Sequence, residues 1–271
     1  MEKTLVMGIL NLTPDSFSDG GKFNSTDSAL RQAEKMIAEG ADILDIGGES
    51  TRPNSARVEV EEEKKRVLPI IEAISKRFDF PLSIDTSKSE VAESAINAGA
   101  EIINDISGLR FDERIGEVSA RFKTGLVLMH LRGTFETMHK QVPVPDILSE
   151  VKQGFQWSID KAQAFGVADE QISLDIGIGF SKTFEQNLEL TANLDKLVTE
   201  FPNTPILIGT SRKSFIGKIL EEPDAEKRLF GSLSSIAIAV FNGAKIVRVH
   251  DVRETVAAVK VAGAIKEWRN K

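Results

Sequence analysis

Short apolar runs alternate with longer amphipathic stretches along the whole chain, and this alternation constrains the fold more than any other feature. A short apolar run bounded by turn-forming residues is typical of a strand, and continuous apolar character is typical of strands buried in a parallel sheet. The runs that we interpret as strands span residues 4–10, 42–47, 81–85, 101–105, 125–130, 171–175, 205–209 and 245–249.

The stretches between these runs have the spacing of amphipathic helices, with apolar residues three and four positions apart. In the first stretch, DSALRQAEKMIAEGA, Asp27 is a candidate N-terminal cap and Gly40 a candidate stop. The pattern over residues 111–122 is less regular than the others. The remaining predicted helices span residues 59–77, 88–98, 147–165, 184–200, 226–242 and 252–268.

The order of these elements predicts an α/β fold. Strands that each lead into a helix pair in parallel through right-handed crossovers. Eight such units in 271 residues fit a single (β/α)8 TIM barrel, so we expect one domain over residues 1–271. A doubly wound open sheet is the alternative, but the even spacing of the units and the lack of a nucleotide-binding fingerprint favour the barrel.

Composition excludes several classes of function. The net charge of −7 argues against a nucleic-acid surface, which needs a basic face. No apolar run approaches the roughly 20 residues of a membrane-spanning helix. The sequence contains no cysteine, which rules out disulfides, thiol nucleophiles and cysteine metal sites, and we expect a cytoplasmic protein. The expected partners are therefore small molecules, with neither nucleic acid nor membrane.

Residues that can do chemistry gather after the strands rather than before them. The segments that precede strands are bland, such as AEGAD and FNGAK, whereas those that follow include DIGGESTRP, SIDTSK and GTSRKSF. In a (β/α)8 barrel the active site lies at the carboxyl ends of the strands. The asymmetry between the two sets of loops therefore predicts a site at that end.

Side-chain parity points several of these residues into the barrel. In LSID, Ser83 and Asp85 share one face of the strand, and in ISLD, Ser173 and Asp175 do. Asp85 alone could instead cap the helix that begins near Lys88, so no single residue decides the matter. The residues predicted to face the barrel mouth are Asn11, Asp85, Asn104, Asp175, Arg248 and His250.

Arg248 and His250, in the run AKIVRVHD, need a partner because an unpaired buried charge is costly. Two carboxylates and an amide suit a ligand edge rich in N–H donors, such as a 2-amino-pyrimidinone ring. Arg212 and Lys213 follow the seventh strand, where such barrels often hold phosphate. We therefore expect a ligand with a donor-rich heterocycle at one end and an anion at the other, and we expect the anion to be the partner of Arg248 and His250.

Ordered sequence blocks resemble those of the dihydropteroate synthase family of pterin-binding (β/α)8 enzymes, from about residue 6 to 257. So many blocks in one order are a specific signal, whereas a lone glycine-rich loop is not. The blocks are GILNLTPDSFSDGG (8–21), DIGGESTRP (45–53), SIDTSK (83–88), INDISG (103–108), LMHLRGTFETM (128–138), DIGIGFSKT (175–183), GTSRKSFIG (209–217) and RLFGSLSSIAIAVFNGAKIVRVHDVRET (228–255).

The resemblance implies a transferase of folate biosynthesis. Members of this family join 6-hydroxymethyl-7,8-dihydropterin diphosphate to p-aminobenzoate. They release 7,8-dihydropteroate and pyrophosphate, with Mg²⁺ as the cofactor. The residues that the resemblance places at the reaction centre are Lys213, Asn11, which would be the Mg²⁺ ligand, Arg248 and His250.

The same resemblance implies binding residues for each part of the reactants. Those implied for the pterin are Ile9, Asp85, Asn104, Met129, Asp175, Gly209 and Lys213. Those implied for the diphosphate are Asn11, Thr51, Arg248 and His250. Those implied for p-aminobenzoate are Pro53, Phe180, Ser211 and the stem of Lys213. The loops expected to close over the reactants contain Asp15, Phe17, Ser50, Thr51 and Arg52.

The chain departs from the family pattern at three positions to which no polar role is assigned. Ile176 and Phe135 stand where the family usually has proline, and Asn54 stands where it usually has glycine. Asn54 adjoins a loop that is expected to move, so loop closure is the feature that this departure affects.

Three other functions fit parts of the pattern. A methyltransferase acting on methyltetrahydrofolate shares the pterin-binding acid and amide, but it has no need for SRK and RVH aimed at a diphosphate. A non-catalytic pterin-binding paralogue would be expected to lack Lys213, Asn11 or Arg248, and all three are present. A phosphate-binding aldolase barrel often uses a Schiff-base lysine, for which Lys213 is the only candidate.

Two further features carry expectations. The stretch IAIAVF (236–241) is apolar all round, which predicts a helix that is buried on more than one side. We expect it to contribute to a homodimer contact, and the alternative is burial under a neighbouring loop. His130 is interpreted as a core or supporting residue rather than a catalyst, because no HExxH motif or other metal spacing surrounds it.

Overall fold

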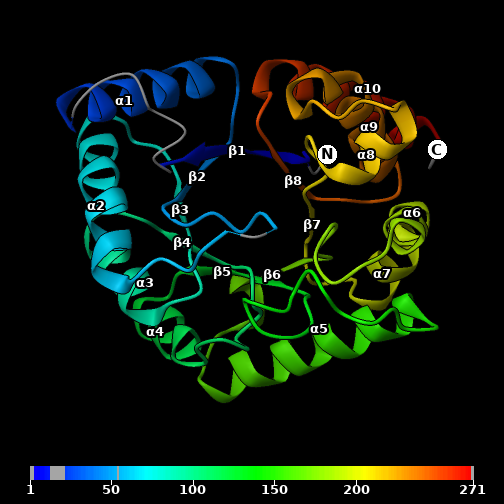
Figure 1. The fold of residues 1–271 in the computed structure, drawn as a ribbon, viewed down its shortest axis with the longest axis horizontal. Helices are drawn as coiled ribbons and strands as arrows, with labels where there is room; N and C mark the ends of the chain where they lie inside the picture. The colour runs from blue at the N-terminus through cyan, green and yellow to red at the C-terminus, as the bar shows by residue number, and fades with distance from the viewer. Residues whose placement is uncertain (1–2, 13–21, 54, 270–271) are drawn as a thin grey trace.

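The structure is a computed structural model that describes residues 3–12, 22–53 and 55–269. Eight parallel strands form a closed barrel in chain order, and helices surround it (Figure 1). The strands are β1 (Leu5–Asn11), β2 (Ile43–Gly47), β3 (Leu82–Asp85), β4 (Ile102–Asp105), β5 (Gly125–Met129), β6 (Ile172–Asp175), β7 (Ile206–Ile208) and β8 (Ile246–Val249).

Helices follow the strands and cover the outside of the barrel. They are α1 (Lys22–Ala38), α2 (Val60–Arg77), α3 (Ser89–Asn97), α4 (Arg114–Phe122), α5 (Ile147–Ala164), α6 (Phe184–Ala192), α7 (Leu194–Glu200), α8 (Ser214–Leu220), α9 (Leu229–Phe241) and α10 (Val252–Arg269), with short 3₁₀ turns at Asp169–Gln171 and Ala225–Arg228. Among the described helices, none combines the length and the apolar character that crossing a membrane requires.

Closure of the sheet confirms the predicted (β/α)8 barrel and excludes the open doubly wound sheet. β1 pairs in parallel with both β2 and β8, so that Met7 lies opposite Ile43 on one side and Arg248 on the other. Every apolar run interpreted as a strand is a strand, and each boundary agrees to about one residue. The alternation of apolar runs with amphipathic stretches was therefore sufficient to define the architecture.

The helices differ from the expectation in three places. α1 begins at Lys22, so Asp27 lies inside the helix and does not cap it, whereas Gly40 follows the helix with a φ of +96° as a stop signal requires. The predicted helix over 184–200 is two helices that meet at Asn193, where the backbone turns to φ −107° and ψ 27°. The seven-residue helix α8 was not predicted, because it is too short to show a helical period.

Apolar side chains fill the barrel interior as well as the layer between strands and helices. Outward-facing residues such as Leu44, Ile84 and Leu174 belong to the large core beneath the helices. The interior layer consists of Met7, Ile43, Val127, Leu207 and Ile246. Because side chains alternate along each strand, the parity that places these residues inside also directs polar residues into the barrel at the strand ends.

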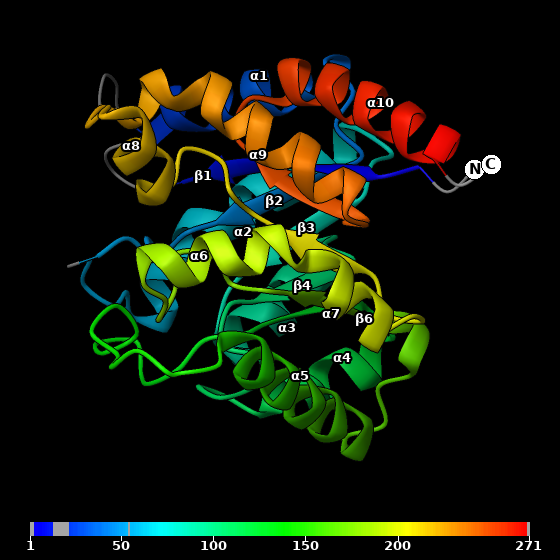
Figure 2. The same cartoon turned by 90° about the vertical axis from the view of Figure 1, so that its right-hand side faces the viewer.

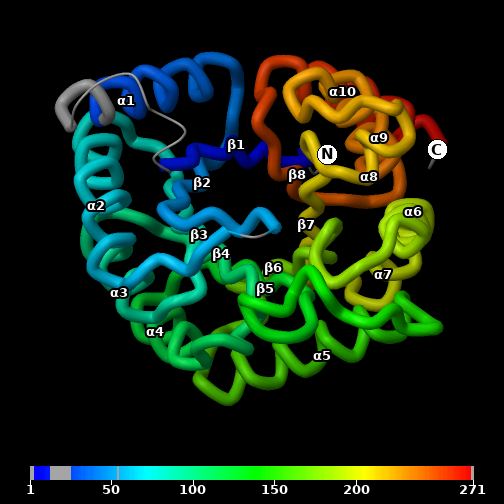
Figure 3. Tube along the Cα trace, in the orientation of Figure 1, coloured from blue at the N-terminus to red at the C-terminus, as the bar shows by residue number. Residues whose placement is uncertain are grey.

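The two ends of the barrel are different. β1 begins and α10 ends at one end, whereas the β2–α2 and β5–α5 segments lie at the other (Figure 2). In the view along the barrel, the β2–α2 segment runs over the opening (Figure 3). The β2–α2 and β5–α5 segments therefore lie at the carboxyl ends of the strands.

Candidate active site

The residues predicted to face the barrel mouth lie on inward-facing positions. The strand register places Asn11 opposite Gly47, Gly47 opposite Asp85, and Asp85 opposite Asn104, which forms one level at the carboxyl ends of β1 to β4. Asp175 ends β6 on the same side of the barrel. The alternative role considered for Asp85 was that of a cap for the helix that begins near Lys88. That helix, α3, has no side-chain cap, so Asp85 does not have this role.

Arg248 is neutralised by the protein itself. Its Nε donates to Asp45 Oδ2 and its Nη2 to Asp85 Oδ2, each at 2.6 Å. Asn104 Nδ2 donates to the same Asp45 oxygen at 2.9 Å. The expectation that a ligand anion supplies the partner of Arg248 therefore needs correction, because two carboxylates of the chain already do so. We call Asp45, Asp85, Asn104 and Arg248 the arginine cluster.

The charges of the arginine cluster shift one another's pKa values. Burial opposes the charge on Arg248, but the attraction of Asp45 and Asp85 outweighs burial and raises the pKa of the guanidinium. Burial raises the pKa of Asp85 to about 7, against the attraction of Arg248, and the charge of Asp45 adds to this rise. The Asp85 carboxyl can therefore donate as well as accept a hydrogen bond near neutral pH.

Gly47 leaves room for two polar side chains at the centre of this level. A methyl group at Gly47 would lie 3.4 Å from Asp85 Cβ and 3.7 Å from Asn11 Oδ1. Asn11 and Asp85 therefore approach the same point from strands on either side of β2. The amide oxygen and the carboxylate together form an oxygen-rich corner of the mouth.

Asp175 and Lys213 occupy the β6–β7 side of the mouth. Asp175 Oδ1 accepts a hydrogen bond from the Gly177 backbone N–H at 2.8 Å. Lys213 immediately precedes α8, and its Nζ donates to the carbonyl oxygen of Ile178. The same Nζ lies 5.0 Å from the centre of the Phe180 ring. We call Asp175, Phe180 and Lys213 the lysine cluster.

Lys213 has no ion pair with a carboxylate among the described residues. Burial lowers the pKa of Lys213 to about 8, against the attraction of Asp175 and with the repulsion of Arg248. Burial likewise raises the pKa of Asp175, against the attraction of Lys213. A methyl group at Gly209 would lie 3.9 Å from Lys213 Nζ and 3.7 Å from Arg248 Cβ, so this glycine keeps the space between the two cations open.

His250 is bonded to a hydroxyl rather than to an acid. Its Nδ1 lies 3.0 Å from Ser211 Oγ, which also accepts from the His250 backbone N–H at 3.2 Å. Burial, together with the charges of Arg212 and Arg248, lowers the pKa of His250 to about 3, so the ring is neutral near pH 7. Arg212 is itself paired with Asp251 at 2.7 Å. The resemblance placed Ser211 in the lining of the p-aminobenzoate site, and its hydroxyl is already bonded to His250.

The β2–α2 segment contacts the other loops of the mouth through His139. His139 Nε2 donates to the carbonyl oxygen of Thr51 at 2.9 Å, and the His139 ring lies 5.5 Å from the Phe180 ring. Ser50 Oγ accepts a hydrogen bond from Ser55 Oγ at 2.9 Å. Of the residues predicted for the loop in this segment, Arg52 and Pro53 are exposed. The predicted loop residues that lie outside the described residues are Asp15 and Phe17.

The apolar residues expected around the pterin lie where parity places them. Ile9 is opposite Asp45 and Met129 is opposite Asp175 in the strand register, and both apolar side chains are buried. Met129 packs with Phe135, one of the departures from the family pattern, in a small apolar cluster. The larger ring at position 135 is therefore accommodated in an apolar cluster that packs against Phe180 of the lysine cluster.

Sequence reasoning missed two residues that organise the mouth. Asp45 is fully buried and lies on the inward face of β2, in register with Ile9 and Ser83. The parity rule applied to DILDIG could have found it. His139 has no comparable signal, since it lies in a turn without strand or helix periodicity.

The mouth fits a lightly coordinated Mg²⁺ ion. The described residues contain no group of three or more His, Cys, Asp or Glu side chains that could enclose a metal. Mg²⁺ does not need such a group, because it keeps several waters and binds through one or two protein oxygens plus substrate phosphates. Asn11 Oδ1, in the oxygen-rich corner beside Asp85, is a donor of that kind.

The fold and the site together define a (β/α)8 barrel enzyme with a polar ligand site at the carboxyl ends of its strands. Residues 7–250 match the family of pterin binding enzymes. The chain is 48% identical over 268 residues to the dihydropteroate synthase of Synechocystis, a match that covers 99% of this chain and 91% of the relative.

Two solved structures agree with this match. The dihydropteroate synthase from Clostridium difficile, in the presence of pteroic acid, aligns with a TM-score of 0.91 and 43% identity over 97% of each chain. That from Xanthomonas albilineans, with 4-aminobenzoic acid, aligns with a TM-score of 0.91 and 39% identity over 98% of this chain and 94% of the other. The chain therefore belongs to the pterin-binding enzymes and, within them, to the dihydropteroate synthase family of transferases.

Proposed function

We propose that the chain condenses 6-hydroxymethyl-7,8-dihydropterin diphosphate with p-aminobenzoate, and that it releases 7,8-dihydropteroate and pyrophosphate. The proposal rests on one observation, the arrangement of the arginine cluster and the lysine cluster at one barrel mouth in a chain of this family. Buried acids suit the donor-rich pterin ring, and fixed cations suit the diphosphate.

For the pterin we propose a slot between the two clusters. The ionised Asp175 accepts two N–H groups of the 2-amino-pyrimidinone edge, as a carboxylate does from arginine. Asp85 and Asn104 bond to the remaining polar groups of the ring. Lys213, which no described carboxylate neutralises, donates to the carbonyl oxygen and the adjacent ring nitrogen. Ile9, Met129 and Gly209 would complete the walls of the slot.

The proposed step breaks the C–O bond between the pterin methylene and the diphosphate and forms a C–N bond. The electron pair of the C–O bond leaves with the diphosphate, and the dihydropterin ring delocalises the positive charge that develops at the methylene. The amine nitrogen of p-aminobenzoate supplies the electron pair of the new bond, and its excess proton passes to water. An arylamine is uncharged near pH 7, so the enzyme must position it rather than deprotonate it.

For the departing diphosphate we propose stabilisation by donors that are fixed before the reaction begins. Arg248 is oriented by its two acids. We assign the Ser211 hydroxyl as the donor to Nδ1 of the neutral His250, which puts the ring proton on Nε2, where it can donate to the diphosphate. The diphosphate-binding residues of this proposal are Asn11, Thr51, Arg248 and His250.

For p-aminobenzoate we propose the region around the Phe180 ring. The centre of this ring is 5.0 Å from Lys213 Nζ and 5.5 Å from that of the His139 ring, and such a ring can offer a flat apolar surface to an arene. Pro53 and the stem of Lys213 would add apolar contacts. Ser211 would contribute part of the wall, because its hydroxyl is bonded to His250.

We also propose that Mg²⁺ takes part, with Asn11 as its protein ligand and the diphosphate as its main partner. The bound ion would supply positive charge to the leaving group. The chain's own contribution is the amide oxygen of Asn11, which the absence of a side chain at Gly47 leaves accessible beside Asp85.

The test is pyrophosphate release from pterin diphosphate and p-aminobenzoate, with and without Mg²⁺. We expect release only when both substrates and the ion are present. A folded protein that binds the pterin but releases no pyrophosphate would instead be the non-catalytic paralogue. Methyl transfer from methyltetrahydrofolate would identify the methyltransferase alternative.

For the assembly we propose a homodimer through α9 and the neighbouring α10. α9 is buried on the barrel side through Ile236 and Val240, yet Phe230 and Ile238 on the same helix are 79% and 52% exposed. On α10, Val261 is 62% exposed. The exposure of Ile238 argues against a covering loop within the described residues. Light scattering that shows a monomer at micromolar concentration would contradict the dimer.

The cysteine-free sequence favours a cytoplasmic location.

A further inference from the structure

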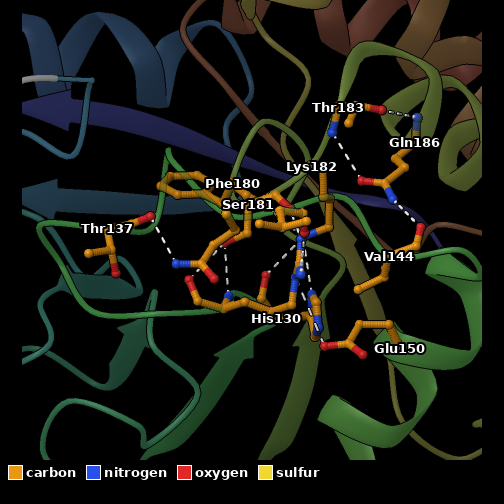
Figure 4. A network of polar contacts seen from close by, with 12 residues as sticks. His130, Thr137, Val144, Glu150, Phe180, Ser181, Lys182, Thr183 and Gln186 are labelled. Carbon is orange, nitrogen blue, oxygen red and sulfur yellow. Dashed lines mark hydrogen bonds and ion pairs between the residues drawn. The ribbon is translucent and has the colours of Figure 1, made fainter.

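A partly buried lysine that the proposed chemistry does not use, Lys182, lies next to the lysine cluster. Lys182 Nζ donates to Phe180 O at 2.9 Å and to His130 O at 3.1 Å, and it lies 3.1 Å from His130 Nδ1 (Figure 4). His130 is only 3% exposed, as expected for a core or supporting residue. Lys182 therefore joins the β6–α6 segment to the end of β5.

The surroundings of Lys182 are matched to an ammonium group. Three acceptor atoms surround Nζ, which equals the number of its N–H donors. Among the described residues no carboxylate forms an ion pair with it. Burial lowers the pKa of Lys182 to about 7, against the attraction of Asp175. A lysine that is desolvated without a counter-ion is costly, so its contacts need an explanation beyond the filling of space.

Two glycines give the backbone the shape that this contact requires. A methyl group at Gly177, where φ is +65°, would lie 2.1 Å from His130 O and 3.1 Å from Lys182 Nζ. A methyl group at Gly154 in α5 would lie 2.4 Å from His130 Cδ2. Both α5 and the turn after β6 therefore close tightly around the pair formed by His130 and Lys182.

A second set of contacts fixes the residue between Phe180 and Lys182. The Arg132 N–H donates to Ser181 Oγ at 2.9 Å, and Arg132 Nη2 donates to Ser181 O at 2.7 Å. Ser181 has a φ of 55°, a conformation that costs free energy for a residue other than glycine. The segment 180–182 is thus held in a shape that it would not adopt without its neighbours, and the place of the Phe180 ring depends on these contacts.

We propose that Lys182 is a positioning residue for the p-aminobenzoate subsite. Its hydrogen bond to the Phe180 carbonyl keeps the Phe180 ring beside Lys213, at 5.0 Å from Nζ. Lys182 acts through the backbone of Phe180 and does not touch the substrate. The identity of the arylamine rests on the proposed function, whereas the fixing of residues 180–182 does not.

The test compares Lys182→Met, which keeps an unbranched side chain one atom shorter and removes its donors, with the parent. We expect amide hydrogen exchange in residues 178–182 to become about tenfold faster. We expect the KM for p-aminobenzoate to rise about tenfold, while kcat and the KM for pterin diphosphate change less than about threefold. Lys182→Gln, which retains two N–H donors, should recover part of the loss. Lys140→Met, at an exposed lysine of the β5–α5 segment, is the matched control and should match the parent.

A double-variant cycle separates positioning from general stabilisation. Because Lys182 acts through Phe180, Lys182→Met should raise the KM for p-aminobenzoate by less than about twofold when Phe180→Ala is already present. The proposal would be overturned if the effects of Lys182→Met and Phe180→Ala on the KM for p-aminobenzoate were additive. It would also be overturned if Lys182→Met raised the KM for p-aminobenzoate and the KM for pterin diphosphate equally. Should Lys182→Met fail to fold, Lys182→Gln and its cycle with Phe180→Ala are judged by the same criteria.

Failure of this proposal is distinct from failure of the proposed function. Unchanged hydrogen exchange over residues 178–182 in Lys182→Met would overturn the positioning role whether or not the parent couples the two substrates. A parent that shows no coupling would contradict the proposed function alone. In that case, faster exchange in Lys182→Met would still support the fixing of the Phe180 segment.

Discussion

The arginine cluster and the lysine cluster share one barrel mouth but treat their positive charges in opposite ways. Arg248 is held by two carboxylates at 2.6 Å, and these raise its pKa. Lys213 is held by a backbone carbonyl, and burial lowers its pKa to about 8. A buried ion pair fixes geometry at a cost in desolvation, whereas an ammonium without a counter-ion keeps its interaction for a ligand.

The difference separates two tasks that the sequence alone presents as one. Both residues are cations at the ends of neighbouring strands, and both were assigned to the reaction centre. The contacts of Arg248 indicate that it first organises the acids around it, whereas those of Lys213 leave it available to the reactants. Stability should therefore depend mainly on the arginine cluster and turnover mainly on the lysine cluster.

The largest expected effect is on stability. Arg248→Met leaves the buried Asp45 and the partly buried Asp85 without a counter-charge, which should lower the free energy of unfolding by about 3–5 kcal/mol. Urea denaturation measures this change. Arg212→Met is the matched control, because its more exposed pair with Asp251 should contribute only about 1 kcal/mol or less. Equal losses of stability in the two variants would contradict a special contribution of the arginine cluster to stability.

The next effect is on turnover. Lys213→Met removes a fixed charge that no described carboxylate neutralises, so steady-state turnover should fall by about 10²-fold or more. Its stability should change less than that of Arg248→Met, since Lys213 attracts Asp175 without forming an ion pair with it, whereas Arg248 forms two ion pairs. A variant that retains turnover within about threefold of the parent would refute the role of Lys213.

A smaller effect is expected on pterin affinity. Asp175→Asn places an N–H donor opposite the donors of the ring, which should weaken binding of pterin diphosphate by about tenfold, or about 1.4 kcal/mol. Calorimetry gives the affinity directly. Asp195→Asn, at an exposed helix position, should leave it unchanged. An unaltered affinity in Asp175→Asn would argue against the carboxylate as the pterin ligand.

The smallest effect concerns pH. The pKa of Lys213 is lowered from its ordinary value of 10.5 to about 8, so the residue is charged below pH 8 and loses its charge as the pH rises through 8. We therefore expect kcat/KM to decline on the alkaline side near pH 8 in the parent. A pH–rate profile of Lys213→Met should lack this decline. Persistence of the same alkaline limb in the variant would assign it to another group.

The barrel and most of its inward-facing residues were predictable because strand parity is a local property. Alternation along LSID and ISLD is enough to place Asp85 and Asp175 without knowledge of any neighbour. The partner of Arg248 was not predictable in this way, because Asp45 lies 203 residues away in sequence and pairs with it only after the sheet closes.

The loop contacts were beyond sequence reasoning for a different reason. His139 and Lys182 lie in segments without periodicity, and their positions are set by the residues they contact. His139 contacts Thr51 and Phe180, and Lys182 contacts His130. The break at Asn193 and the short α8 likewise reflect packing against neighbours rather than a pattern in the letters.

The pairing of the first strand with the last has a consequence for biosynthesis. β8 closes the sheet against β1 and brings Arg248 to Asp45. The two acids of the arginine cluster therefore lack the counter-charge of Arg248 while the chain is still emerging from the ribosome. Contacts between such distant residues form slowly. The catalytic mouth should thus be among the last parts of the nascent protein to mature, and acidic repulsion within it should persist until the eighth strand docks.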